Sequence, residues 1–259
     1  MRLDVATVLV QWSAGGLLGC WVTTRRRLVG VGYGWLLRSV FVVLAFGGAA
    51  AGLAESTQTV GAVVRDAGAL VMACGALGAL LVSVVRRSAG VAGERSFNPT
   101  LDLLAPLAGL VALFGAAAAV GGAYPLSAAR LLAGGLLLGL VTDAMLLGHW
   151  YLVQPGLPRD PIREIVRLCA PAWLLDVSLL LVPTGMLSVL SGSINDGYGG
   201  LLGAMWVVSA ITTIALLWVT WRALAEPYYS AVMAATGLLY LTILMSFGTD
   251  VLARALLAR

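Results

Sequence analysis

The chain has 259 residues, of which 60% are hydrophobic and only 11% are charged. A soluble domain carries about 25% charged residues, so twelve acidic and sixteen basic side chains are too few to cover a water-soluble surface of this size. Together with a mean hydropathy of +0.97, this composition predicts a polytopic membrane protein in contact with a lipid bilayer.

Eight apolar segments are long enough to cross a bilayer, for which about 20 residues are needed. In lipid each segment must be helical, because an unpaired backbone group there costs several kcal/mol. We therefore expect an all-α bundle of about eight membrane-spanning helices that forms a single domain over residues 1–259. The predicted spans are 5–24, 29–54, 68–85, 101–122, 131–153, 168–190, 201–221 and 229–248.

Two short matches indicate that the bundle consists of two four-helix halves. The sequence at 13–18 resembles that at 132–137, and the sequence at 35–38 resembles that at 173–176. Both matches fit a parallel tandem repeat, although a chain rich in Leu, Gly and Ala also produces such matches by chance. Gly135 and Gly139 have the spacing at which helix backbones pack closely.

Arginine placement predicts the orientation of the bundle. All sixteen basic residues are Arg, which is typical of a GC-rich bacterial genome, and they concentrate in short loops. Ten lie in the gaps after odd-numbered spans and five on the other side, with Arg38 left out of the count. The positive-inside rule then predicts a bacterial inner (cytoplasmic) membrane protein with both termini outside. This topology explains the net charge of +4 without a nucleic-acid partner.

Polar groups inside the spans are the candidate functional residues, since each costs energy to place there. Asp143 lies in the fifth span and Asp176 in the sixth, and one cytoplasmic loop joins the two spans. We therefore expect both carboxylates at a similar depth in adjacent antiparallel helices. Pro171 and Pro183 flank Asp176 and can bend its helix, which favours a polar cavity; the alternative is a structural ion pair.

Arg38 is the basic residue best placed to be a buried ion-pair partner, with Asp176 as its counterpart. If the second helix instead begins near Leu36, Arg38 can reach the membrane surface, and both alternatives are open. Asp102 and Asp250 fall near the ends of predicted spans, where we expect them to be solvated.

The only histidine, His149, is followed by Trp150 and Tyr151 at the cytoplasmic end of the fifth span. With Asp143, Asp176 and the Tyr151 ring, His149 has the donors and aromatic walls of a quinone or proton-transfer site. The alternative is an interfacial aromatic belt. One His cannot hold a haem between two histidines, and no metal-ligand cluster is present.

The stretch 154–167 contains three prolines and then an amphipathic turn. Its stiffness suits the docking of other protein subunits, although an ordered turn explains it equally well.

Three functions fit these features. The first is an integral membrane subunit of a bioenergetic or redox complex of the respiratory type, which is not a catalyst alone. The second is a compact proton- or cation-coupled transporter. The third is a structural or assembly component without chemistry.

Overall fold

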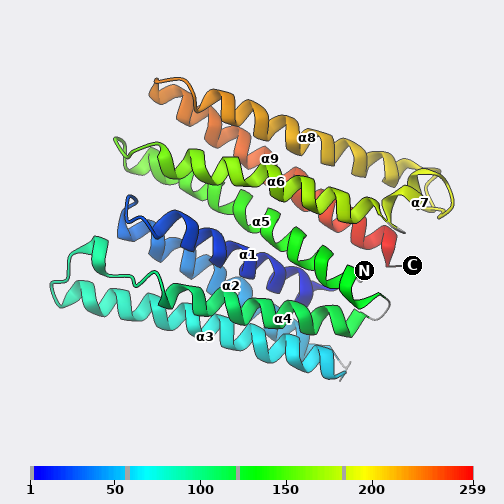
Figure 1. Cartoon of the computed structure of the whole chain (residues 1–259), viewed down its shortest axis with the longest axis horizontal. Coiled ribbons are helices and arrows are strands. Elements are labelled where there is room, and N and C mark those ends of the chain that lie inside the picture. The colour runs from blue at the N-terminus through cyan, green and yellow to red at the C-terminus, as the bar shows by residue number, and fades with distance from the viewer. Residues whose placement is uncertain (1–2, 56–58, 121–122, 183–184, 259) are drawn as a thin grey trace.

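The computed structural model describes residues 3–55, 59–120, 123–182 and 185–258, and no strand occurs among them. Long helices lie side by side with α1 and α5 in the middle of the bundle, and both termini lie at the same end (Figure 1). The long helices are α1 Val5–Thr24, α2 Val31–Ala54, α3 Val60–Ser88, α4 Leu104–Val120, α5 Tyr124–Val153, α6 Asp160–Leu181, α8 Leu201–Ala223 and α9 Tyr229–Leu257. The described residues also form three short helices: η1 Gly93–Arg95, η2 Leu101–Leu103 and α7 Met186–Leu190.

The expected all-α bundle of about eight spans is confirmed. Seven of the described helices are long and apolar enough to cross a membrane, with η2 and α4 counted as one span. The remaining long helix, α6, contains five charged residues but lies alongside the others (Figure 1). Below, the terminal end is the end of the bundle that holds both chain termini. The arginine-rich end is the opposite end, which holds residues 25–30, 89–103, 154–159 and 224–228.

Each half of the chain forms a closed ring of four helices. In the first ring α1 contacts α2, α2 contacts α3, α3 contacts α4, and α4 returns to α1. In the second ring α5, α6, α8 and α9 contact one another in the same order. The rings meet mainly where α1 packs against α5, two helices that run in the same direction. This arrangement has the form that a parallel internal repeat requires.

Two tryptophans at matching positions in the short repeats make matching contacts. The Trp35 indole on α2 donates a hydrogen bond to Ser83 Oγ on α3 at 2.9 Å. The Trp173 indole on α6 donates to the Ala210 carbonyl on α8 at 3.0 Å. In each half, therefore, the second helix is tied to the third by an equivalent tryptophan.

Glycines set the distance between the two halves. A Cβ atom on Gly15 would lie 1.7 Å from the Gly135 carbonyl oxygen, and one on Gly139 would lie 2.0 Å from the Gly15 carbonyl carbon. The backbones of α1 and α5 are thus in direct contact, as the spacing of Gly135 and Gly139 predicts.

Three helices are longer than the hydropathy pattern predicts, each at the terminal end. Helix α3 begins at Val60 rather than 68, α5 begins at Tyr124 rather than 131, and α9 ends at Leu257 rather than 248. The extensions contain charged side chains that are buried by packing, so the helices continue where a hydropathy criterion stops. These buried residues are Arg65, Asp66, Arg130, Asp250 and Arg254.

The sixth span also differs from its prediction. Helix α6 begins at Asp160 and ends at Leu181, whereas the predicted span was 168–190. Its start follows the Asp-Pro pair at 160–161, because proline is favoured in the first turn of a helix. Pro171 lies inside the helix, whereas Pro183 falls outside the described residues.

Replacement of Gly15 by alanine tests the contact between the halves. We expect Gly15→Ala to destabilise the protein by about 1–3 kcal/mol or more, because the added methyl group meets the backbone of α5. The matched control is Gly237→Ala on α9, where an added Cβ meets nothing within 4 Å. Thermal unfolding in detergent measures both variants. Equal melting temperatures for the two variants would contradict the direct backbone contact.

Candidate functional site

Polar side chains from three helices meet at the contact between the halves. Gln11 on α1, Asp176 on α6 and Asp250 and Arg254 on α9 are each at most 2% exposed. Arg254 Nε lies 2.7 Å from Asp250 Oδ2, and its Nη2 donates to Gln11 Oε1. Gln11 Nε2 in turn donates to Asp250 Oδ1 at 3.2 Å. We call these four residues the central cluster.

A glycine on α5 provides the space for the central cluster. A Cβ on Gly134 would lie 2.7 Å from Gln11 Nε2, 3.1 Å from Asp250 Oδ1 and 3.4 Å from Asp176 Oδ1. The amide and the two carboxyl groups therefore converge on the position of one missing side chain. The adjacent glycines Gly134 and Gly135 therefore have different roles: Gly134 leaves space for polar side chains, and Gly135 allows the close contact between α1 and α5.

The charges of the central cluster do not cancel. Asp250 forms an ion pair with Arg254, whereas no basic side chain among the described residues forms an ion pair with Asp176. Asp176 Oδ1 is buried and has no hydrogen-bond partner among the described residues. An isolated buried carboxylate is costly unless it is paired or takes up a proton. The central cluster therefore contains one carboxyl group more than its guanidinium neutralises.

Asp143 on α5 is a second buried acid without a partner. It is completely buried, and neither carboxyl oxygen has a hydrogen-bond partner among the described residues. Gly19 makes room for it, because a Cβ there would lie 2.2 Å from Asp143 Oδ2. Arg38 is the basic side chain close enough to interact electrostatically with Asp143.

Asp143 and Asp176 do not share a site. Asp176 lies against Gly134, and Asp143 is nine residues further along the same helix. With a rise of about 1.5 Å and a rotation of about 100° per residue, the two acids are separated by about 14 Å along α5 and lie on opposite sides of it. Asp143 and Asp176 lie on adjacent helices, as expected, but the expectation that they lie at a similar depth is wrong.

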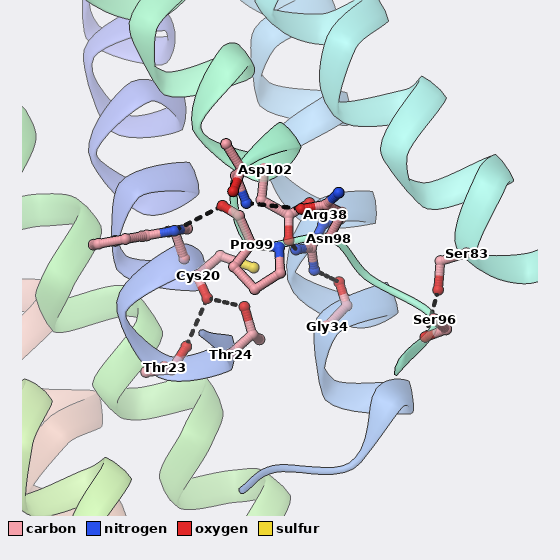
Figure 2. Close-up of polar contacts among 12 residues, drawn as sticks. Cys20, Thr23, Thr24, Gly34, Arg38, Ser83, Ser96, Asn98, Pro99 and Asp102 are labelled. Atoms are coloured by element: carbon pink, nitrogen blue, oxygen red, sulfur yellow. Dashed lines mark hydrogen bonds and ion pairs between the residues drawn. The ribbon is translucent and has the colours of Figure 1, made fainter. Parts of the chain in front are cut away.

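Arg38 is buried, with only 3% of its side chain exposed (Figure 2). Its Nη2 lies 2.7 Å from Asp102 Oδ2, and its Nη1 donates to the Gly34 carbonyl at 2.9 Å. Its guanidinium carbon is 3.6 Å from the centre of the Phe97 ring. The surface alternative for Arg38 is therefore wrong, and its ion-pair partner is Asp102 rather than Asp176.

The expected solvation of Asp102 and Asp250 is also wrong. The Asp102 side chain is 6% exposed, because residues 93–103 fold over the beginning of α2. Asp250 is 2% exposed, because α9 continues beyond it and packs against α5. Hydropathy places both residues near the ends of spans, but it cannot show what covers those ends.

The other sequence candidates lie apart from these acids. His149 is exposed and makes no hydrogen bond with any residue that the structure describes. Tyr151 is buried, and its hydroxyl group donates to the Pro158 carbonyl, so that it fixes the loop after α5. His149 is six residues after Asp143, which turns it well away from the Asp143 side of α5. The described residues therefore do not assemble the expected quinone site around His149.

Two more buried arginines lie near the terminal end. Arg65 forms ion pairs with Asp4 at 3.2 Å, Asp66 at 2.8 Å and Glu55 at 3.5 Å. Arg130 donates to the carbonyls of Leu179 and Val182 at the end of α6, where helix carbonyls lack internal partners. These arginines join helices and explain why charged residues are tolerated there.

Asp250, Arg254 and Gln11 were not predicted to be site residues. One signal was present: Asp250 and Arg254 are four residues apart, the spacing at which opposite charges pair on one helix face. Apolar residues continue to Leu257, which indicates that the helix extends past this pair.

Comparison of the chain with protein-family models, curated proteins and solved structures found no match.

Two asparagine substitutions distinguish the paired acid from the unpaired one. We expect Asp250→Asn to destabilise the protein by about 3–5 kcal/mol, because it breaks the buried ion pair between Asp250 and Arg254. Asp176→Asn should cost much less, because Asp176 forms no ion pair in the described structure. Thermal unfolding of both variants in detergent provides the measurement. A larger loss for Asp176→Asn would show that the assignment of Arg254 to Asp250 is wrong.

Proposed function

We propose that the chain is a compact proton- or cation-coupled membrane transporter in which Asp176 binds the coupling ion. The observation that carries this proposal is a buried carboxyl group with an oxygen that lacks a partner, beside the Asp250–Arg254 pair. It lies where the two halves of the bundle meet.

The energetics of a buried charge explain how Asp176 would respond to an ion. Acidic side chains within membrane spans are costly and typically mark ion or proton pathways. Arg254 is bonded to Asp250 and Gln11, so its single positive charge does not balance both Asp250 and Asp176. Binding of a proton or a small cation removes the excess negative charge, and its release restores that charge. The occupancy of Asp176 therefore changes the electrostatic balance among α1, α6 and α9.

The position of the central cluster also supports transport. Transporters built from repeated halves place ion and substrate sites at the contact between the repeats, near the middle of the membrane. Here α1 and α5 form that contact, and Gln11 and Gly134 belong to these two helices. Ion binding at this contact is well placed to alter how the halves pack.

Asp143 provides a second ionisable group nearer the arginine-rich end. Its separation from Asp176 along α5 means that the two acids face different parts of the bundle. We infer that Asp143 is a second station on the ion pathway, with Arg38 as the nearby positive charge.

The respiratory-type subunit is the second candidate, and a fixed surface at the arginine-rich end supports it. Arg159 donates to the carbonyls of Pro227 and Tyr228 at 2.8 and 2.9 Å, and Tyr151 holds Pro158. Such an ordered surface suits docking of a partner subunit at 154–167. Quinone chemistry has weaker support, because His149 is exposed and distant from the buried acids.

We also propose that the arginine-rich end faces the cytoplasm of a bacterial cell. Ten arginines lie at that end, whereas Arg65, Arg130 and Arg254 near the other end are buried within the bundle. These buried residues do not count as loop charges, so the bias is stronger than the sequence count indicates. The positive-inside rule then places both termini outside.

Charge displacement tests ion binding without knowledge of the transported substrate. Proteoliposomes adsorbed on a solid-supported membrane receive a sudden change of pH, Na⁺ or K⁺. We expect a transient current for at least one of these ions, and we expect Asp176→Asn to abolish it. The matched control is Asp160→Asn at the exposed beginning of the same helix, which should retain the current.

Two results would contradict the transport proposal. One is the absence of any current from the folded wild-type protein with all three ions. The other is an unchanged current in Asp176→Asn. Copurification with other subunits together with either result would favour the subunit candidate.

A further inference from the structure

A groove lies beside the Arg38–Asp102 pair, on the side of the first half that faces lipid. It has a volume of about 260 Å³ and runs between α3 and the segment 96–104. Most of its lining is apolar, including Gly75, Gly78 and Val82 on α3 and Leu101 and Leu104 on the other wall. Arg86 and Asn98 also line it and bring polar groups to the apolar groove.

The groove is open to the outside of the bundle. Val82, Leu101 and Leu104 are each more than half exposed, and a Cβ on Gly78 would meet nothing within 4 Å. Helix α3 is one of the candidate spans, and only a third of its most apolar window is buried. In a bilayer, an acyl chain is therefore the species available to fill this space.

The wall opposite α3 is held in place by polar contacts with α1, α2 and α3 (Figure 2). Ser83 Oγ donates to Ser96 Oγ at 3.0 Å, and the Trp21 indole donates to the Pro99 carbonyl at 2.9 Å. The Arg38–Asp102 ion pair fixes the far end of the same segment. The groove is thus preformed, which reduces the entropy that an occupant would have to overcome on binding.

The charge of the groove favours an anion. Arg86 lies in the last turn of α3, near the arginine-rich membrane surface, and forms no ion pair with any described residue. The acid that lines the groove, Asp102, is already neutralised by Arg38. The lining therefore has one uncompensated positive charge beside an apolar channel.

We propose that this groove binds one anionic phospholipid of the leaflet at the arginine-rich end. Its acyl chain lies along Gly75, Gly78 and Val82, and its phosphate group binds the Arg86 guanidinium. Guanidinium groups bind phosphate oxygens through charge-assisted hydrogen bonds, and basic pockets between membrane helices bind anionic headgroups. This proposal does not depend on the transport function.

Native mass spectrometry of protein released from nanodiscs tests the site. The nanodiscs contain equal amounts of phosphatidylglycerol and phosphatidylcholine, so that headgroup charge is the variable. We expect wild-type protein to retain phosphatidylglycerol preferentially. Arg86→Gln should abolish that preference, whereas Arg87→Gln, a neighbouring arginine that does not line the groove, should leave it unchanged.

A second pair of variants tests the apolar part of the groove. Gly78→Phe fills the open space and should reduce retention of both lipids. Gly237→Phe, at an exposed glycine on α9 that also has open space, should not. Size-exclusion chromatography confirms that each variant is folded before its spectra are compared. Equal retention of the two lipids by the wild-type protein would overturn the proposal, as would equal effects of Arg86→Gln and Arg87→Gln.

Discussion

The bundle depends on the polar partners of arginines that are buried between its helices. Arg38 joins α2 to the segment before α4, Arg65 joins α3 to the beginning of α1, Arg130 joins α5 to the end of α6, and Arg254 joins α9 to α1. Each guanidinium needs carboxylates, an amide or carbonyl oxygens, because an unpaired charge in an apolar interior is very costly. The packing of the helices is therefore constrained by the position of these partners.

This constraint separates structural acids from candidate functional ones. Asp102 and Asp250 each neutralise one arginine, and their burial is explained by those ion pairs. Asp143 and Asp176 contain buried carboxyl oxygens without a partner among the described residues. Asp143 and Asp176 form no ion pair among the described residues that would stabilise the fold, so ion binding offers a reason for their presence in the membrane. The glycine contact between α1 and α5 places Asp176 where a change of charge acts on both halves.

Hydropathy predicted the helical class and the approximate number of spans, because these follow from a local apolar pattern, and the two short sequence matches predicted two four-helix halves. It failed at Asp250 and Arg65, where helices continue through charged residues whose partners come from other helices. The partner of Arg38 could not be predicted either, because it depends on how residues 93–103 fold over α2. Asp143 and Asp176 were identified as unusual, but their separation follows from the faces of α5 that they contact. His149 was predicted to be a site residue because imidazole can transfer protons, but it lies on an exposed face of α5.

Infrared difference spectroscopy of the reconstituted protein tests the role of Asp176 most directly. A change of pH or of cation concentration should alter the C=O stretching band of a protonated carboxyl group. We expect the part of this change that comes from Asp176 to disappear in Asp176→Asn and to persist in Asp160→Asn. A difference spectrum that is the same in wild-type protein and Asp176→Asn would contradict the claim that Asp176 binds the coupling ion.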